Sequence, residues 1–122
     1  MNKAADFIAL MFFARNFTHR EHLRTTFLSR HIALEEFYNS IVELADKFTE
    51  VYQGRNGIIE DVSLDTVDQP AQDSLSLLEA QVEWIETNRY LIAPIKDTPI
   101  QNIIDEIVGQ YLHTIYKYRT LM

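Results

Sequence analysis

Apolar residues recur every three or four positions along most of this chain, which is the pattern of helices that bury one face. The clearest such stretch ends at Gly54, and its apolar stripe consists of Leu34, Phe37, Ile41, Leu44, Phe48 and Val51. A different face of the same segment carries His31, Asp46 and Glu50. The pattern predicts one long helix with an apolar face for its own core and a second face that is either solvated or in contact with another molecule.

Three more helices are expected around this one. The first covers residues 2–16, the third runs from Asp73 or Ser74 to about residue 92, and the last begins at Asp97 or Thr98 and continues to the C-terminus. Residues 55–73 lack helical periodicity and form a loop, with a short extended piece at residues 58–62. The expected fold class is therefore all-α, a four-helix bundle with a longer connection between helices two and three. A single domain spans residues 1–122.

The start of the second helix has two interpretations. Thr18 followed by Glu21 fits a capping box, in which a hydroxyl and a carboxylate satisfy free N–H groups at a helix start. A start at Thr25 or Thr26 is the alternative. His19 consequently falls either in the connection or in the first turn of a helix.

Composition narrows the class of protein. The chain has 122 residues, 47% of them hydrophobic, with 3 Gly, 3 Pro and no Cys, which suits one helical core and excludes thiolate metal sites. No apolar run reaches the roughly 18 residues that span a bilayer, so we expect no membrane and a cytoplasmic location. The net charge of -7 argues against binding a phosphate backbone, and nucleic acid is not an expected partner.

Positive charge is nevertheless concentrated in one short window. Four of the eleven basic residues, Arg15, Arg20, Arg24 and Arg30, lie within sixteen positions. They form either a solvated helix face or a local contact with an anionic group.

Two imidazoles and two carboxylates are the candidate metal ligands: His19, His31, Asp46 and Glu50. Imidazole nitrogen and carboxylate oxygen together suit iron, zinc or manganese. Residues 19–53 contain no Gly and no Pro, so His31 and Asp46 are expected on one helix. Fifteen residues at about 1.5 Å each separate them by roughly 22 Å, too far to hold one metal ion within a subunit. His22 is either a fifth ligand, a residue that supports a ligand, or a structural or exposed residue with no metal.

A shared site requires a second copy of the chain, most simply through an antiparallel two-fold pairing of this helix with its twin. If His31 faces Asp46 or Glu50 of the other copy, the axis crosses midway, at residues 38–41. A homo-oligomer is therefore expected, with Tyr38, Asn39 and Val42 at the two-fold contact.

The ligand spacing resembles that of the Dps branch of the ferritin-like superfamily, the mini-ferritins, in which His, His, Asp and Glu are followed by a glycine, here Gly57. The sequence is closer still to small tailed-phage Dps-like proteins. It shares with them His-x-x-His-Leu-x-Thr at residues 19–25, Tyr-Gln-Gly at residues 52–54 and Ile-Tyr-Lys-Tyr at residues 115–118. The resemblance implies a ferritin-like bundle, with His19 and His31 binding iron from one subunit and Asp46 and Glu50 from its mate.

The chain also departs from the mini-ferritin pattern. Arg20 replaces the usual Trp, Arg24 and Thr25 replace the Gly-containing turn, and the basic N-terminal tail by which relatives hold DNA is absent. Two functions of different classes follow. The first is a metal-binding protein that oxidises Fe(II), a ferroxidase. The second is a non-catalytic helical oligomer that keeps the fold and contacts a host or phage protein.

Overall fold

The computed structural model, which describes residues 2–64 and 73–122, contains four helices and no strand within those ranges. The helices are α1 (Lys3–Arg24), α2 (Leu28–Asn56), α3 (Ser74–Ile92) and α4 (Thr98–Thr120). The all-α, four-helix prediction is thereby confirmed. Within the described ranges, no helix has the length and apolar character needed to cross a membrane.

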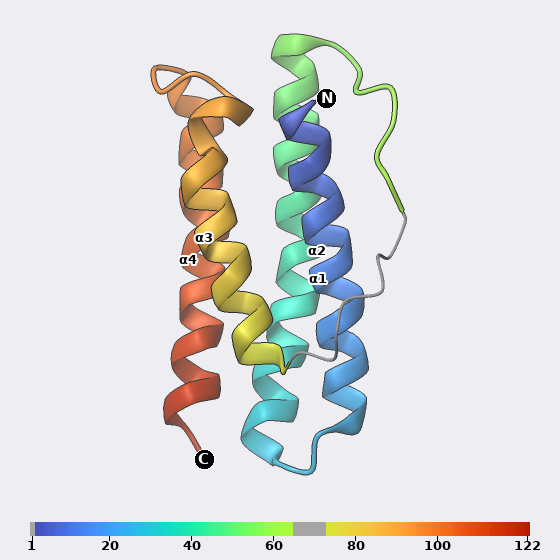
Figure 1. Ribbon diagram of the computed structural model, residues 1–122, viewed down its shortest axis with the longest axis vertical. Helices are drawn as coiled ribbons and strands as arrows, with labels where there is room; N and C mark the ends of the chain where they lie inside the picture. The colour runs from blue at the N-terminus through green and yellow to red at the C-terminus, as the bar shows by residue number, and fades with distance from the viewer. Residues whose placement is uncertain (1, 65–72) are drawn as a thin grey trace.

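Each helix packs against two others and runs antiparallel to both. The packed pairs are α1 with α2, α2 with α4, α3 with α4, and α1 with α3 (Figure 1). Helices α2 and α3 lie across the bundle from each other and run in the same direction, so the connection between them joins opposite ends of the bundle. That connection is the longest of the three, as the sequence predicted, since the other two are only a few residues long.

Large apolar side chains from all four helices fill the core. The Phe7 ring meets the Phe48 ring edge to face at 4.8 Å, and the Phe37 ring meets Tyr111 in the same way at 4.9 Å. These contacts join α1 to α2 and α2 to α4. The predicted apolar stripe of α2 faces this core, although Val51 at its end remains 37% exposed.

The prediction that the first helix ends near Asn16 is wrong. Helix α1 continues without a break to Arg24, and the capping box at Thr18 does not form. Instead the Thr18 hydroxyl donates to the backbone oxygen of Ala14 at 2.7 Å, which satisfies it inside a continuous helix. The alternative start near Thr25 is the correct one, because α2 begins at Leu28.

The other predicted boundaries need smaller changes. Helix α2 passes through Gly54 and ends at Asn56, where Gly57 adopts a φ of 85°, a conformation that favours glycine. The Asp73 side chain caps α3 by accepting from the Ser76 N–H at 2.7 Å, as expected. Residues 58–62 form neither helix nor strand, as expected of a loop, so the short extended piece is not part of a sheet. The rest of the predicted loop, from residue 65 to residue 72, lies outside the described residues.

Candidate functional site

Three histidines gather where α1 ends and α2 begins. Because α1 continues to Arg24, it carries both His19 and His22, one turn apart, and His31 follows in the first turns of α2. The His22 ring stacks on the His31 ring with centroids 3.7 Å apart and lies 6.1 Å from the His19 ring. The structure thus brings the three imidazoles together, with His22 in contact with both of the others.

His22 and His31 exchange hydrogen bonds with each other's backbone. Nδ1 of His22 lies 2.7 Å from the backbone oxygen of His31, and Nδ1 of His31 lies 2.8 Å from the backbone oxygen of His22. A carbonyl oxygen only accepts, so each Nδ1 must carry the proton and donate. The neutral ring then has its lone pair on Nε2, which is the arrangement found in metal-binding histidines.

The two hydrogen bonds between His22 and His31 also have a structural role. The carbonyl of His22 belongs to the last turn of α1, where backbone oxygens lack helical partners. His31 supplies one such partner, so the pair fastens the end of α1 to the start of α2. His22 is only 7% exposed, so it is not an exposed residue, and its bonds to His31 give it the structural role that the sequence left open.

His19 packs against an aromatic residue of α2. Its ring stacks on Tyr38 with centroids 4.3 Å apart, and the Arg15 guanidinium carbon lies 5.7 Å from the centre of the same Tyr38 ring. Tyr38 is therefore buried within its own subunit, at 8% exposure. Asn39 and Val42, its predicted companions at the two-fold contact, are exposed.

Asp46 and Glu50 lie further along α2, and both are exposed. Neither forms an ion pair within residues 2–64 and 73–122. Beside Asp46 is a groove of about 230 Å³ between α1 and α2, whose lining is Met11, Phe12, Arg15, Asn16, Ile41, Val42, Ala45, Asp46 and Leu64. The two carboxylates thus share the outer face of α2 with Asn39 and Val42, as the sequence predicted.

The described residues of one chain do not assemble a metal site by themselves. Among the described residues, no group of three or more His, Cys, Asp or Glu side chains is placed to hold a metal ion. His31 and Asp46 do lie on one continuous helix, so the separation of roughly 22 Å expected from helical rise applies. The histidine cluster and the carboxylate pair are therefore two separate groups, which we refer to as the candidate half-sites.

Sequence comparison gives the chain a family. One family profile matches residues 22–118, and its description is a family of unknown function, DUF5856. The chain belongs to the DUF5856 family. A relative in Enterobacteria phage T4, the "Uncharacterized 14.6 kDa protein in mobD-ri intergenic region", is 24% identical over 115 residues, covering 94% of this chain and 87% of the phage protein. No solved structure matches the chain.

The DUF5856 match begins at His22 and includes His31, Asp46 and Glu50, whereas His19 lies before it. The T4 relative agrees with the phage origin that the resemblance implied. Neither comparison names a Dps-like or ferritin-like protein, so that resemblance rests on the ligand spacing and the short shared sequence strings.

Sequence reasoning missed two parts of this site. The mutual bonding of His22 and His31 spans the turn between two helices, and the only signal for it was the short distance of nine residues between them. The stacking of His19 on Tyr38 had no sequence signal, because it depends on α1 continuing past Asn16.

Proposed function

We propose that this DUF5856 protein is a ferritin-like, Dps-like metal-binding protein that oxidises Fe(II) at sites shared between two subunits. The observation that carries the proposal is the histidine cluster. Its mutual hydrogen bonds hold Nδ1 protonated on His22 and His31, which leaves each Nε2 as a donor atom for a metal.

The connectivity of the bundle supports the ferritin-like part of the proposal. Ferritin-like folds are four-helix bundles with one long crossover, and here the long connection joins two parallel helices, α2 and α3. The α1–α2 pair of this bundle holds both half-sites, since the histidines lie at the junction of the two helices and the carboxylates lie further along α2.

A two-fold pairing of α2 with its twin would unite the half-sites. With the axis near residues 38–41, His31 of one copy lies beside Asp46 and Glu50 of the other, and His19 completes the set. The exposure of Asn39, Val42, Asp46 and Glu50 supports this pairing, since none of them is covered within its own subunit.

The donor set fits iron as a substrate. Two or three imidazole nitrogens and two carboxylates offer borderline and hard ligands that bind both Fe(II) and Fe(III), while zinc and manganese accept the same donors. Electrons pass from Fe(II) to peroxide or dioxygen as the co-substrate. The side chains of the protein hold the ion and leave the redox chemistry to iron.

An anaerobic Fe(II) titration followed by peroxide tests the proposal. Wild-type protein should bind Fe(II) in a saturable manner and then develop ferric absorbance. Asp46→Ala should lose both, because it removes a donor from each shared site. Asn39→Glu should lose metal binding together with the dimer, seen by sedimentation, since it places two like charges at the axis.

Two matched variants complete the experiment. Glu86→Ala removes an exposed carboxylate from α3, and Asn102→Glu adds a charge to an exposed position of α4. Both should behave as wild type. The proposal is wrong if wild-type protein binds no Fe(II), or if a strictly monomeric variant still binds it with all four ligands.

The second candidate function is the non-catalytic oligomer that acts by contact with another protein. The observation in its favour is that His22 and His31 already have a structural role, fastening α1 to α2 without any metal. If purified protein carried stoichiometric iron, zinc or manganese, contact with another protein would not be its only function.

A further inference from the structure

A second surface lies at the end of the bundle where α1 meets α2. Four apolar side chains are exposed there: Leu23 at 71%, Phe27 at 57%, Leu28 at 72% and Leu121 at 44%. The Ser29 hydroxyl donates to the backbone oxygen of Leu121 at 3.2 Å, so the turn and the last residues of the chain are neighbours. We call these four side chains, together with Arg30, the turn surface.

Arg30 is held in a fixed position on this surface. Its guanidinium carbon lies 4.7 Å from the centre of the Phe27 ring and 4.6 Å from that of Tyr118. Within the described parts of the chain, no carboxylate pairs with it. Ring contacts on the faces of a guanidinium leave its N–H edge free, and that edge matches a carboxylate in two-point hydrogen bonding.

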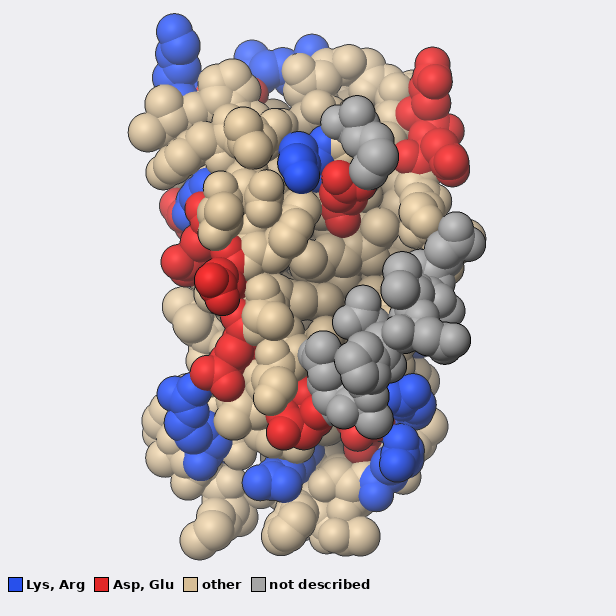
Figure 2. Space-filling model, in the orientation of Figure 1, with Lys and Arg blue, Asp and Glu red and all other residues tan. Residues whose placement is uncertain are grey.

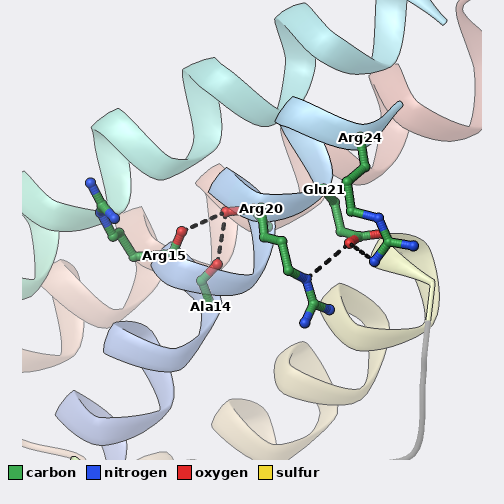
Figure 3. A network of polar contacts seen from close by, with 6 residues as sticks. Ala14, Arg15, Arg20, Glu21 and Arg24 are labelled. Carbon is green, nitrogen blue, oxygen red and sulfur yellow. Dashed lines mark hydrogen bonds and ion pairs between the residues drawn. The ribbon is translucent and has the colours of Figure 1, made fainter. Parts of the chain in front are cut away.

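Two further arginines lie near the end of α1. Arg20 and Arg24 both reach Glu21, at 3.2 Å and 3.4 Å, and Figure 3 shows the two guanidiniums converging on that one carboxylate. Among the residues that the structure describes, Arg20, Arg24 and Arg30 therefore have a single ion-pairing acid, Glu21, although the net charge of the chain is -7. Figure 2 shows Lys and Arg side chains near this lower end of the bundle.

We infer that the turn surface docks a segment of a partner protein that presents acidic side chains next to apolar ones. An exposed Phe beside an oriented Arg is typical of protein-binding surfaces, in which aromatic residues and Arg are enriched. A nucleic acid or an anionic membrane would be repelled by the remainder of a molecule of charge -7, whereas a short acidic segment meets only Arg30 and the residues beside it. The inference goes beyond the proposed function, because none of the candidate metal ligands belongs to this surface.

A selection from a library of random short peptides tests this inference. Peptides are selected on the immobilised wild-type protein, and those that also bind Arg30→Glu protein are discarded. The retained peptides should combine Asp or Glu with Leu, Phe or Trp. In fluorescence anisotropy, Arg30→Glu should weaken their binding by about tenfold or more, and Leu23→Gln by several-fold.

Matched variants at the opposite end of the bundle control for general effects. Leu91 is the penultimate residue of α3, as Leu23 is of α1, and is 67% exposed. Leu91→Gln and Lys96→Glu should leave peptide binding unchanged. Metal binding should persist in Arg30→Glu, so failure of this inference is separable from failure of the proposed function.

Four results would overturn the inference. Selection could yield no peptide that distinguishes wild type from Arg30→Glu, or only peptides without acidic residues. Vesicles of phosphatidylglycerol or a DNA duplex could bind the turn surface when no peptide does. Sedimentation could show a self-associated protein that Leu23→Gln dissociates, which would make a second copy the occupant.

Discussion

At the scale of single residues, the core contains one polar pair whose contribution to stability can be measured. The Tyr111 hydroxyl donates to Oε1 of Gln81 at 2.5 Å, and Gln81 donates in turn to the backbone oxygen of Leu10. Burial raises the pKa of Tyr111, so the phenol stays protonated and remains a donor. Tyr111→Phe should lower the free energy of unfolding by about 1–2 kcal/mol, because it leaves a buried amide oxygen unpaired.

Urea denaturation measures this change. Tyr116→Phe, at an exposed position of the same helix, should stay within about 0.5 kcal/mol of wild type. The double variant Tyr111→Phe with Gln81→Leu should regain part of the loss, since both polar partners are then gone. Equal losses for the two single Tyr variants would contradict the assignment.

At the candidate site, some residue positions could be predicted from the sequence and others could not. The spacing of His31, Asp46 and Glu50 correctly placed them on one helix, apart from its apolar stripe, because that depends only on helical period. The bonding of His22 to His31 depends on the path of a three-residue turn. Turn geometry is set by the packing of both helices, and no period in the sequence encodes it.

At the scale of helices, an ionic cluster ties α2 to α4. Glu36 on α2 accepts a hydrogen bond from Lys117 at 2.8 Å and lies 3.1 Å from Nε2 of His113. The bond from Lys117 holds the pKa of Glu36 below its ordinary value of 4.5, aided by the charges of Lys117 and His113 and opposed by partial burial. A lowered pKa in the folded state stabilises the protein at pH above 4.5. That stabilisation is lost as the pH falls through the folded-state value.

Glu36→Gln should therefore cost about 0.5 kcal/mol at neutral pH, a modest amount because the carboxylate is partly exposed. The difference from wild type should shrink as the pH falls below 4.5 and through the lowered pKa of Glu36, where the wild-type carboxylate also becomes neutral. Thermal unfolding between neutral and acidic pH measures both. Glu35→Gln, at the exposed neighbouring position, should match wild type at neutral pH. A difference between Glu36→Gln and wild type that persists at low pH would refute the role of the ion pair.

The same scale explains which helix boundaries were predictable. Asp73 and Asp97 precede helices as expected, because an acidic or polar residue before an apolar periodic stretch is a strong start signal. Thr18 gave a false start signal. Within a continuous helix, a threonine hydroxyl can equally well donate to the carbonyl four residues earlier. Only the packing of both halves of α1 on the core decides between a new helix start at Thr18 and a continuous helix.

At the scale of the whole molecule, periodicity predicted four helices but not their directions. Four helices with short connections would alternate up and down, and only the length of the segment between α2 and α3 hinted otherwise. Helices α2 and α3 run parallel because of the way in which the α1–α2 pair packs against the α3–α4 pair. The two-fold contact near Asn39 stays a prediction, because it concerns a second chain.

Helices α1 and α2 form one antiparallel hairpin, and α3 and α4 form another. The molecule consists of these two helical hairpins packed together. Neither hairpin closes the core alone, since Phe7 of α1 packs on Trp84 of α3 and Phe37 of α2 packs on Tyr111 of α4. A chain cut between α2 and α3 should therefore reassemble from its two fragments, and co-purification with recovery of helical circular dichroism would demonstrate it. Two fragments that are each fully helical and soluble alone would contradict this.

The connection between α2 and α3 then also acts as a tether. Because it joins the two hairpins covalently, it keeps the second hairpin at an effective concentration that does not depend on the amount of protein in solution. A tether that joins opposite ends of the bundle also permits an exchange, in which the α3–α4 hairpin of one copy docks on the α1–α2 hairpin of another. Correct assembly of the monomer therefore requires that the two hairpins of one chain dock on each other faster than they dock on the hairpins of another chain.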